Sequence, residues 1–560
     1  MNTETLQERA EQVAMEQSRV IDGMPKPPVV IDMKRSSAKL IESYRSIYSN
    51  IKHESNMVPA AEWLVDNFYI IEGHIKDIQF NLRNGYFKDL PVLKGADYRE
   101  DLRVYEIARE IIDFTSGRLD SDIIYKFIDQ YQKVTPLTIS ELWAIPLMLK
   151  IVLIQNIEYM AVDIENTQKL KYEGYRWGQR MIEAFEKSSV QLYAVLDQHD
   201  RHYKYMQMSY ADSLLRCLQD HGAEAATIIK QIDRRLIRQG DSADSVAQRE
   251  YKRQTEAKVS MGNVITSLKL VSEIRWEDII EDLSLMDRVL RKDPAQIYGR
   301  MDFKSRDYYR KELAKLAKRA DLDEVYVARL VLECIENRDD SMQDDIKFKH
   351  VGYYLVGKGR QILKDYIGLE DRRIYDRAKV YIGGIMGLTA LCIGLFLLTS
   401  GILAEGFNAL TILYILLALV PILSIVIGLA NWLITTKYPP SILPRLELKD
   451  GIPKEFETMV ITPTLLTSKK SVEELAKQME VFYMANKDKR LHFAIVGDFK
   501  DGPNEYESSD DEIAQAGIEA IRALNAKYGE GIFFYFNRSR QWNEDQRLWM
   551  GWERKRGALV

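Results

Sequence analysis

Cysteine is scarce in this sequence, and its scarcity excludes two ways of stabilising a fold. The 560-residue chain has three cysteines, Cys217, Cys334 and Cys392, at unrelated spacings. They form neither a disulfide framework nor a zinc-binding pattern, which is typical of soluble parts kept in a reducing compartment. Because 560 residues exceed what one hydrophobic core supports, we expect two to four domains.

The sequence also lacks a basic excess and an apolar N-terminal segment. The formal net charge is −5, whereas chains that bind nucleic acid usually carry an excess of Lys and Arg. We therefore expect no nucleic-acid partner. The first twenty residues, MNTETLQERAEQVAMEQSRV, are charged throughout, which predicts no cleaved signal peptide. Residues 1–34 are mostly polar, contain the string PKPPVV, and are predicted to be a mobile N-terminal arm.

Charge is absent from two long runs, one between Lys379 and Glu405 and the other between Glu405 and Lys437. Each run exceeds the roughly 20 apolar residues that cross a bilayer core. We predict a transmembrane hairpin over residues 379–436, with spans at about 380–402 and 409–434, multi-pass in the membrane.

The flanks of this hairpin predict its orientation. Cations lie on both outer sides, while the short connecting loop has none: Lys364, Arg372, Arg373, Arg377 and Lys379 before it, and Lys437, Arg445 and Lys449 after it. By the positive-inside rule both flanks are cytoplasmic. The N-terminal region and the part after the hairpin are therefore expected on the same side.

Residues 35–375 show helical periodicity with few chain breakers, which predicts an all-helical cytoplasmic region. Thr138 and Glu141 have the spacing of a capping box before an apolar helix. His199 and His202 have an H-x-x-H spacing, but no Cys or E-x-x-H partner lies near them in sequence. We interpret them as solvated side chains between helices rather than metal ligands.

After a linker over residues 437–455 the periodicity changes. Short apolar runs at 457–466, 491–499 and 531–538 alternate with two helical segments. The first helical segment opens with the capping pair Ser471 and Glu474. The order strand, helix, strand, helix, strand predicts a parallel sheet, so that residues 456–560 form an incomplete α/β domain.

Ligands of such sheets bind beyond the carboxyl ends of the strands. Those ends carry Thr462, Pro463 and Thr464 on the first strand, Asp498 on the second, and residues 537–540 on the third. A carboxylate at the end of the second strand suits the base or ribose of a nucleotide. Asp498 and Thr464 have an equally simple alternative role, which is to close a turn.

Three strands leave the first strand with an open apolar edge, whereas a doubly wound sheet continues past its switch point. We therefore expect the sheet to continue beyond Val560, with the strip LWMGWERKRG at 548–557 leading into that continuation.

Several long strings carry a family resemblance. In the C-terminal part they are VITPTLLTS, LHFAIVGDF and RQWNEDQRLWMGWERKRG; upstream they are PAAEWLVDNFYIIEGHI, LTISELWAIPLMLKIVLIQNI, GNVITSLKLVSEIRW, RKDPAQIYGRMDFKSRDYYR and HVGYYLVGKGR. Together these strings resemble the cyclic β-1,2-glucan synthases, whose transferase part is glycosyltransferase family 84. The resemblance extends from about Pro59 to the end of the sequence. Family members are far longer, so the chain is similar to an N-terminal portion.

The resemblance implies a bacterial inner-membrane hexosyltransferase of carbohydrate biosynthesis, which transfers glucose from UDP-glucose to a growing β-1,2-glucan. It also implies a GT-A-like fold and a divalent metal, Mg or Mn, held by a D-x-D motif in the full-length enzyme. No D-x-D occurs between Ile461 and Val560. The metal ligands and the catalytic residues are therefore expected downstream of Val560.

The resemblance further assigns roles within LWMGWERKRG. Fixed cations would stabilise the charge that develops on a departing diphosphate, which makes donor-binding candidates of Arg554, Lys555 and Arg556. Trp549 and Trp552 are candidates for stacking against a sugar. The alternative is that these tryptophans and cations lie in the membrane interface.

A function from a different class stays open. A cytoplasmic helical array on a hairpin anchor is also the organisation expected of a non-catalytic membrane scaffold or sensor. Binding of UDP-glucose, and its loss on Asp498→Ala, separates the two hypotheses.

Overall fold

The computed structural model describes residues 5–18, 20–21, 27–51, 58–83, 87, 90–93, 101–337, 345–369, 377–401, 409–437, 440 and 442–559. By its internal contacts the chain divides into two units. The first unit comprises Met1–Gly299 and Phe303–Ile442, and the second comprises Arg300–Asp302 and Leu443–Val560.

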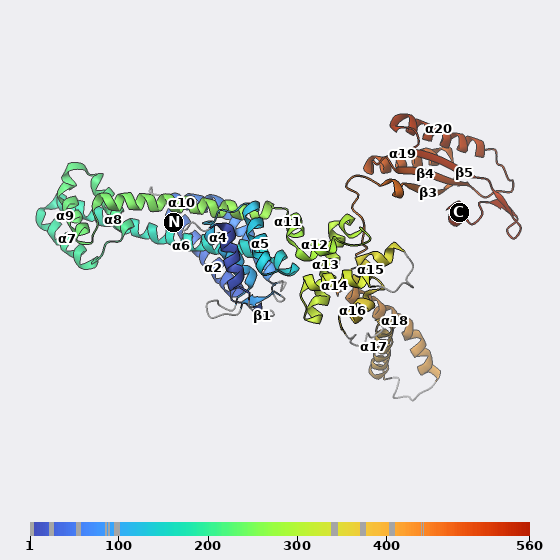
Figure 1. Ribbon diagram of the computed structural model, residues 1–560, viewed down its shortest axis with the longest axis horizontal. Coiled ribbons are helices and arrows are strands. Elements are labelled where there is room, and N and C mark those ends of the chain that lie inside the picture. The colour runs from blue at the N-terminus through green and yellow to red at the C-terminus, as the bar shows by residue number, and fades with distance from the viewer. Residues whose placement is uncertain are drawn as a thin grey trace. The chain divides into compact units, whose positions relative to one another are not determined.

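The first unit is mostly helical, as the periodicity predicts (Figure 1). Its helices are α1 (Leu6–Glu16), α2 (Pro28–Ile51), α3 (Pro59–Arg83), α4 (Arg103–Phe114), α5 (Ser121–Val134), α6 (Ile139–Lys187), α7 (Ser189–His202), α8 (Met208–Gln219), α9 (Ala226–Arg238), α10 (Ala243–Glu273), α11 (Trp276–Leu283), α12 (Leu285–Leu290), α13 (Phe303–Ala320), α14 (Glu324–Glu336), α15 (Val351–Leu355), α16 (Arg360–Tyr366), α17 (Arg377–Thr399) and α18 (Ala409–Lys437). Two short strands, β1 (Val20–Ile21) and β2 (Val92–Leu93), pair antiparallel.

The 49-residue helix α6 runs through the first unit and packs against α2, α4, α8 and α10. The predicted capping box at its start is confirmed: the Thr138 side chain accepts from the backbone of Glu141, and Glu141 reciprocates. Glu141 is fully buried and also accepts two hydrogen bonds from Arg103, at 2.6 and 2.7 Å. One carboxylate therefore caps α6 and ties it to α4.

The structure differs from the mobile arm expected over residues 1–34. Helix α1 begins after Thr5, which forms a capping box with Glu8, and it packs against α5. Ala10, Val13 and Ala14 are fully buried. The polar composition of this segment hides three small apolar residues at helical spacing, and these are enough to hold one narrow face against the core.

His199 is buried, contrary to the expectation of a solvated side chain. Its Nε2 lies 2.9 Å from the Tyr210 hydroxyl and its Nδ1 2.8 Å from the Arg235 guanidinium. Burial and the neighbouring Arg235 lower the pKa of His199 to about 4. The ring is therefore a neutral core group that joins α7, α8 and α9, and among the described residues no His, Cys, Asp and Glu cluster could hold a metal.

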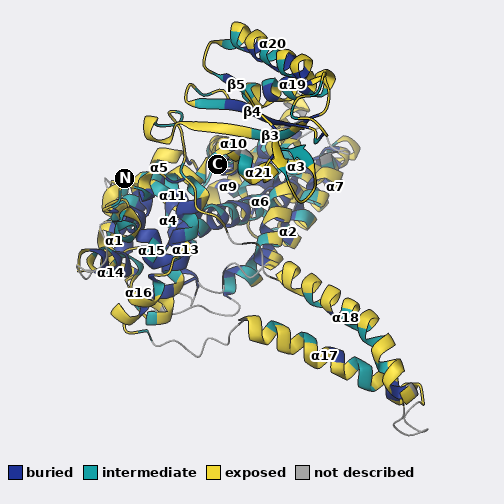
Figure 2. Cartoon of the chain, turned by 90° about the vertical axis from the view of Figure 1, so that its right-hand side faces the viewer, coloured by how far each residue is buried: buried dark blue, intermediate teal, exposed yellow. Residues whose placement is uncertain are grey.

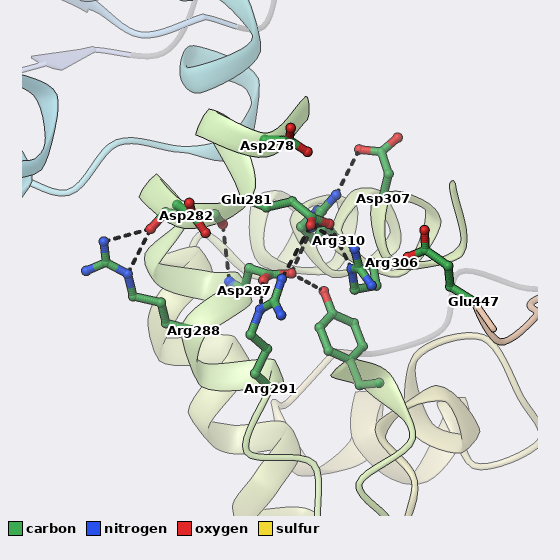
Figure 3. Close-up of polar contacts among 12 residues, drawn as sticks. Asp278, Glu281, Asp282, Asp287, Arg288, Arg291, Arg306, Asp307, Arg310 and Glu447 are labelled. Carbon is green, nitrogen blue, oxygen red and sulfur yellow. Dashed lines mark hydrogen bonds and ion pairs between the residues drawn. The ribbon is translucent and has the colours of Figure 1, made fainter. Parts of the chain in front are cut away.

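A network of buried charges joins α11, α12 and α13 (Figure 3). Arg310 is fully buried and donates to Glu281 at 3.0 Å and to Asp287 at 2.8 Å. Arg306 donates to both oxygens of Glu281, and the Tyr298 hydroxyl donates to Asp287 at 2.6 Å. Burial and the Asp287 charge raise the pKa of Tyr298 well above its usual range. We interpret this network as structural, because its arginines and carboxylates form ion pairs with one another.

Within the described part of the chain, three helices are long and apolar enough to span a membrane: α6, and the α17 and α18 segments over Ala378–Thr399 and Thr411–Lys437. The apolar part of α6 is largely covered by other helices of the chain, whereas the other two expose most of their side chains. The predicted pair of spans thus corresponds to α17 and α18, which pack together, with the Tyr381 hydroxyl donating to Asn431 at 2.8 Å. The connecting loop at 402–408, and Arg372 and Arg373 in the flank, lie outside the described residues.

The second unit contains the predicted parallel sheet, with strands β3 (Thr458–Leu466), β4 (Leu491–Phe499) and β5 (Phe533–Arg538) in the order β3-β4-β5. Helices α19 (Lys469–Ala485) and α20 (Asp510–Tyr528) connect them, and a hairpin, β6 (Gln541–Asn543) and β7 (Leu548–Met550), precedes α21 (Arg554–Leu559). The cap of α19 is Ser468 paired with Ser471, rather than the expected Ser471 and Glu474. The shorter serine side chain closes the same reciprocal bonds three residues earlier.

Both helices cover the same face of this sheet. Their side chains form one core with Phe493, Ile495 and Phe533 from the strands. Residues at alternate positions face the other way, and among them Met459, Ile461 and Phe536 are 40%, 39% and 49% exposed. We call this second surface, formed by Met459, Ile461, Phe534 and Phe536, the open face. Figure 2 shows β3 as a largely exposed strand.

Residues Arg300–Asp302 belong to the second unit by their contacts. Met301 forms an antiparallel bridge with Leu446, and the Glu447 amide donates to the Arg300 carbonyl at 2.8 Å. The linker predicted over residues 437–455 is therefore held at its centre by backbone pairing rather than being free along its length.

The buried network makes a stability prediction for Arg310→Ala. This substitution removes the fully buried cation that Asp287 and Glu281 share, and leaves Asp287 with the partly exposed Arg291 and Glu281 with Arg306. Removing one partner of a buried pair typically costs about 3–5 kcal/mol. We expect a clearly lower midpoint of thermal unfolding, measured by the helical circular dichroism of the purified chain in detergent. Arg291→Ala is the matched control, because Arg291 also pairs with Asp287 but its side chain is 41% exposed. Equal midpoints for the two variants would contradict the prediction.

Candidate functional site

The predicted site residues divide between neighbouring strands of the parallel sheet. The strand register places Asp498 opposite Leu465 on one side and Arg538 on the other. Thr462, Pro463 and Thr464 lie inside β3 rather than beyond its end, because β3 continues to Leu466. These three residues are half-buried. The carboxyl edge of the sheet is therefore formed by Asp498, Arg538 and the segments that follow them.

Asp498 and Arg538 form a two-pronged ion pair at this edge. The Arg538 Nε donates to Asp498 Oδ1 and its second terminal nitrogen to Oδ2, both at 2.7 Å. The hydrogen bonds that Arg538 donates to Asp498 raise the pKa of its guanidinium above the usual value. The Asp498 side chain is 9% exposed. Register partners in a parallel sheet share a face, so the pair is preset by the pairing of β4 with β5.

The same guanidinium holds the basic segment, defined here as residues 551–557. Arg538 donates to the backbone carbonyls of Trp552, at 3.2 Å, and Arg554, at 3.1 Å. Glu553 lies between these two contacts, and Arg554 supplies the carbonyl of the second. Their φ angles are +46° and +37°, a left-handed conformation that costs non-glycine residues about 1–3 kcal/mol each. The Arg538 contacts offset that strain.

Glycines at both ends of the basic segment fit against the ion pair. A Cβ on Gly551 would lie 2.8 Å from the carboxyl carbon of Asp498, and a Cβ on Gly557 would clash first with the Trp552 carbonyl oxygen and would lie 2.9 Å from an Arg538 nitrogen. Either contact is closer than real Cβ atoms tolerate. The spacing of these glycines in the sequence is thus a consequence of how closely the segment approaches Asp498 and Arg538.

The predicted cations differ in their surroundings. Arg554 pairs with Asp501, and the Arg556 Nε lies 3.4 Å from Glu553. Lys555 is exposed, and the Arg556 side chain is 81% exposed. Arg554 is therefore partly neutralised by the loop after β4, Arg556 lies in solvent beside its ion-pair partner Glu553, and Lys555 presents its charge to solvent. Exposed positive groups fixed on a folded backbone are suited to bind a phosphate group.

The two candidate tryptophans do not play the same part. Trp549 lies in β7, where its ring is 5.8 Å from that of Trp542, and its backbone exchanges two hydrogen bonds with Gly502. Trp549 therefore fixes the loop after β4. Trp552 is 56% exposed and packs close to Gly557. An exposed indole beside exposed cations can offer a face to a sugar ring or to an apolar boundary.

Sequence reasoning missed the second anchor of this edge, the pair Arg540 and Asp510. Both are buried, and Arg540 also donates to the carbonyls of Lys500 and Glu505, at 2.6 and 3.0 Å. Burial alone would raise the pKa of Asp510, but hydrogen bonds from Arg540 and the Glu507 amide lower it overall. The feature of the sequence that could have indicated this pair is the spacing of Arg538 and Arg540, which lie at alternate positions where β5 ends.

Metal binding was expected from outside this chain, and the described residues supply no alternative. They contain no group of three His, Cys, Asp or Glu side chains that could hold a metal ion. Asp498, Asp501 and Asp510 are each occupied by an arginine. The exposed cations of the described part of the site are suited to an anionic ligand.

Comparison with known proteins gives one strong similarity and no family model that matches the chain. The chain is 27% identical over 541 residues to cyclic beta-(1,2)-glucan synthase NdvB of Rhizobium meliloti (strain 1021). The alignment covers 94% of the chain but 19% of NdvB, so the chain spans about a fifth of the length of this relative. The resemblance read from the sequence strings is thereby confirmed: the chain is homologous to a portion of a cyclic beta-(1,2)-glucan synthase.

Proposed function

We propose that this chain is the donor-binding portion of a membrane-anchored glucosyltransferase that transfers glucose from UDP-glucose to a growing β-1,2-glucan. The observation that carries the proposal is the homology to NdvB along nearly the whole chain. The parallel sheet with a basic segment at its carboxyl edge supports it, because nucleotides bind at this edge of open α/β sheets. In this proposal the sheet is the first part of a GT-A-like domain.

The basic segment would hold the diphosphate of the donor. Lys555 and Arg556 carry exposed charge, and Arg554 lies beside them. Transfer of glucose leaves negative charge on the departing UDP, and cations already fixed in place stabilise that charge without further reorganisation. Trp552 would stack against the sugar. Thr462, Pro463 and Thr464, inside β3, stay proposed donor-binding residues, and Trp549 stays a candidate for stacking against the sugar. Asp498 stays the proposed contact for the nucleoside.

The two apolar helices α17 and α18 would anchor the enzyme in a bacterial inner membrane, with both soluble parts cytoplasmic, where UDP-glucose is made. The divalent metal, Mg or Mn, and the catalytic residues would be supplied by parts of the enzyme outside this chain.

Nucleotide binding is tested with Lys555→Ala and Arg556→Ala. A charge-assisted hydrogen bond is worth about 1.5–3 kcal/mol, so each substitution should weaken UDP binding roughly ten- to a hundredfold. Titration calorimetry of the purified chain with UDP measures this affinity. The affinity for uridine, which lacks the diphosphate, should change little in either variant. Lys487→Ala and Lys489→Ala are matched controls, because both lysines are exposed just before β4, at the opposite edge of the sheet.

Equal UDP binding by the Lys555→Ala and Arg556→Ala variants and the wild-type chain would refute the assignment of the basic segment. If the folded wild-type chain binds neither UDP nor UDP-glucose, the alternative function, a non-catalytic membrane scaffold or sensor, is favoured instead.

Sugar stacking is tested with Trp552→Ala. An aromatic face contributes about 0.5–1.5 kcal/mol beyond its buried area, so the affinity for UDP-glucose should fall roughly two- to tenfold while that for UDP stays constant. The same titration, run with both ligands, measures the ratio. A parallel loss for both ligands, or none, would favour the membrane interface as the environment of Trp552.

Membrane topology is tested by cysteine labelling. In a chain in which Cys217, Cys334 and Cys392 are replaced by serine, Glu405→Cys should react with a membrane-impermeant maleimide added to intact spheroplasts. Lys449→Cys should react only after the membrane is permeabilised, because the outer flanks are expected on the cytoplasmic side. The reverse pattern would contradict the proposed orientation.

A further inference from the structure

Arg538 lies where the sheet and the basic segment meet, and it has no role among the donor contacts proposed above. Its guanidinium makes four contacts: two to Asp498 at 2.7 Å, one to the Trp552 carbonyl at 3.2 Å and one to the Arg554 carbonyl at 3.1 Å. The carboxylate cancels its charge, and its donors are directed at protein oxygens. Arg538 is therefore poorly suited to bind a diphosphate itself.

What Arg538 does control is the path of the backbone that carries the cations. The carbonyls it holds lie on either side of Glu553, in the stretch where Glu553 and Arg554 have positive φ. The Arg554–Asp501 ion pair and the hydrogen bond from the Arg554 amide to the Gly551 carbonyl, at 3.4 Å, also hold this turn, but Arg538 is the side chain that holds the carbonyls on both sides of Glu553. The side chains of Lys555 and Arg556 extend from the residues directly after it.

The residues around the Arg538 guanidinium leave space for it and for the groups that it contacts. Gly551 leaves room for Asp498, and Gly557 leaves room for the Trp552 carbonyl and for the Arg538 guanidinium that this carbonyl contacts. Asp498 and Arg538 are register partners on β4 and β5, so the platform is as rigid as the sheet. A glycine at each end and a strained turn between them are what a segment needs to close over an ion pair.

We propose that Arg538 is a positioning residue of the donor site: locked to Asp498, it holds the carbonyls of Trp552 and Arg554 and thereby places Lys555 and Arg556 for the diphosphate. This inference rests on the proposed function for the identity of the ligand. It also gives Asp498 a second role, since the carboxylate orients the guanidinium that orders the basic segment.

The informative substitution is Arg538→Lys. Lysine keeps the positive charge beside Asp498, but its single ammonium group cannot hold a carboxylate and two separate carbonyls as the planar guanidinium does. The variant should therefore keep the sheet and release the basic segment. Asn525→Ala is the matched control, because Asn525 exchanges two hydrogen bonds with the Phe533 backbone at the other end of β5.

The first measurement is hydrogen exchange of the peptide covering residues 551–557 in the full chain without nucleotide. We expect exchange at least tenfold faster in Arg538→Lys and near the wild-type rate in Asn525→Ala. Unchanged exchange in Arg538→Lys overturns the inference. Because no ligand is present, this outcome is distinguishable from a failure of the proposed function, which is a wild-type chain that binds no UDP.

The second measurement is a double-mutant cycle on UDP affinity. Arg538→Lys should weaken UDP binding about tenfold or more, and Lys555→Ala should then cause little further loss, since the lysine is no longer in place. A purely structural role for Arg538 predicts the opposite, namely that Lys555→Ala weakens binding by the same factor in both backgrounds. Additive losses therefore overturn the inference, and non-additive losses support it.

Discussion

The arrangement of the C-terminal unit depends on one ion pair between adjacent parallel strands. Asp498 and Arg538 are brought together by the register of β4 and β5, and no loop has to fold correctly for them to meet. Once paired, Arg538 has donors left over at the carboxyl edge of the sheet, and backbone carbonyls from the basic segment take them. The sheet positions the ion pair, and the ion pair in turn positions the basic segment. The charged residues of this segment therefore take a fixed conformation from the sheet next to them.

The first unit uses buried charge differently. In its network around Arg310 and Asp287, the buried arginine donates to carboxylates from two neighbouring helices. Such a network ties α11, α12 and α13 to one another but exposes little charge to a ligand. The pairs at the carboxyl edge of the sheet are the reverse case. There the arginines nearest the sheet are neutralised, and the cations further along the chain are left exposed.

Much of this architecture follows from local sequence patterns. The arginine partner of Asp498 and the burial of His199 do not follow from them, and both have the same physical reason. Alternating apolar runs located β3, β4 and β5, and the Thr138 and Glu141 spacing located the start of α6, because both depend on neighbours in sequence. The arginine partner of Asp498 could not be predicted in the same way, since it depends on which residues of two strands become register partners. The same holds for His199, whose burial depends on Tyr210 and Arg235 from other helices. Helix α1 was not predicted within the expected mobile arm, because a narrow apolar face of small residues barely alters the composition of the segment.

The open face of the sheet has a consequence for handling the protein. Met459, Ile461 and Phe536 are exposed on the side away from α19 and α20, and β3 is one of the two outer strands of the described sheet. Exposed apolar strands are templates on which other chains add. Residues 443–559 produced by themselves would therefore tend to self-associate through β3 and to be captured by chaperones that bind extended apolar segments. Surface charges introduced on the open face, rather than changes at the carboxyl edge, are the rational route to a soluble fragment that keeps the basic segment intact.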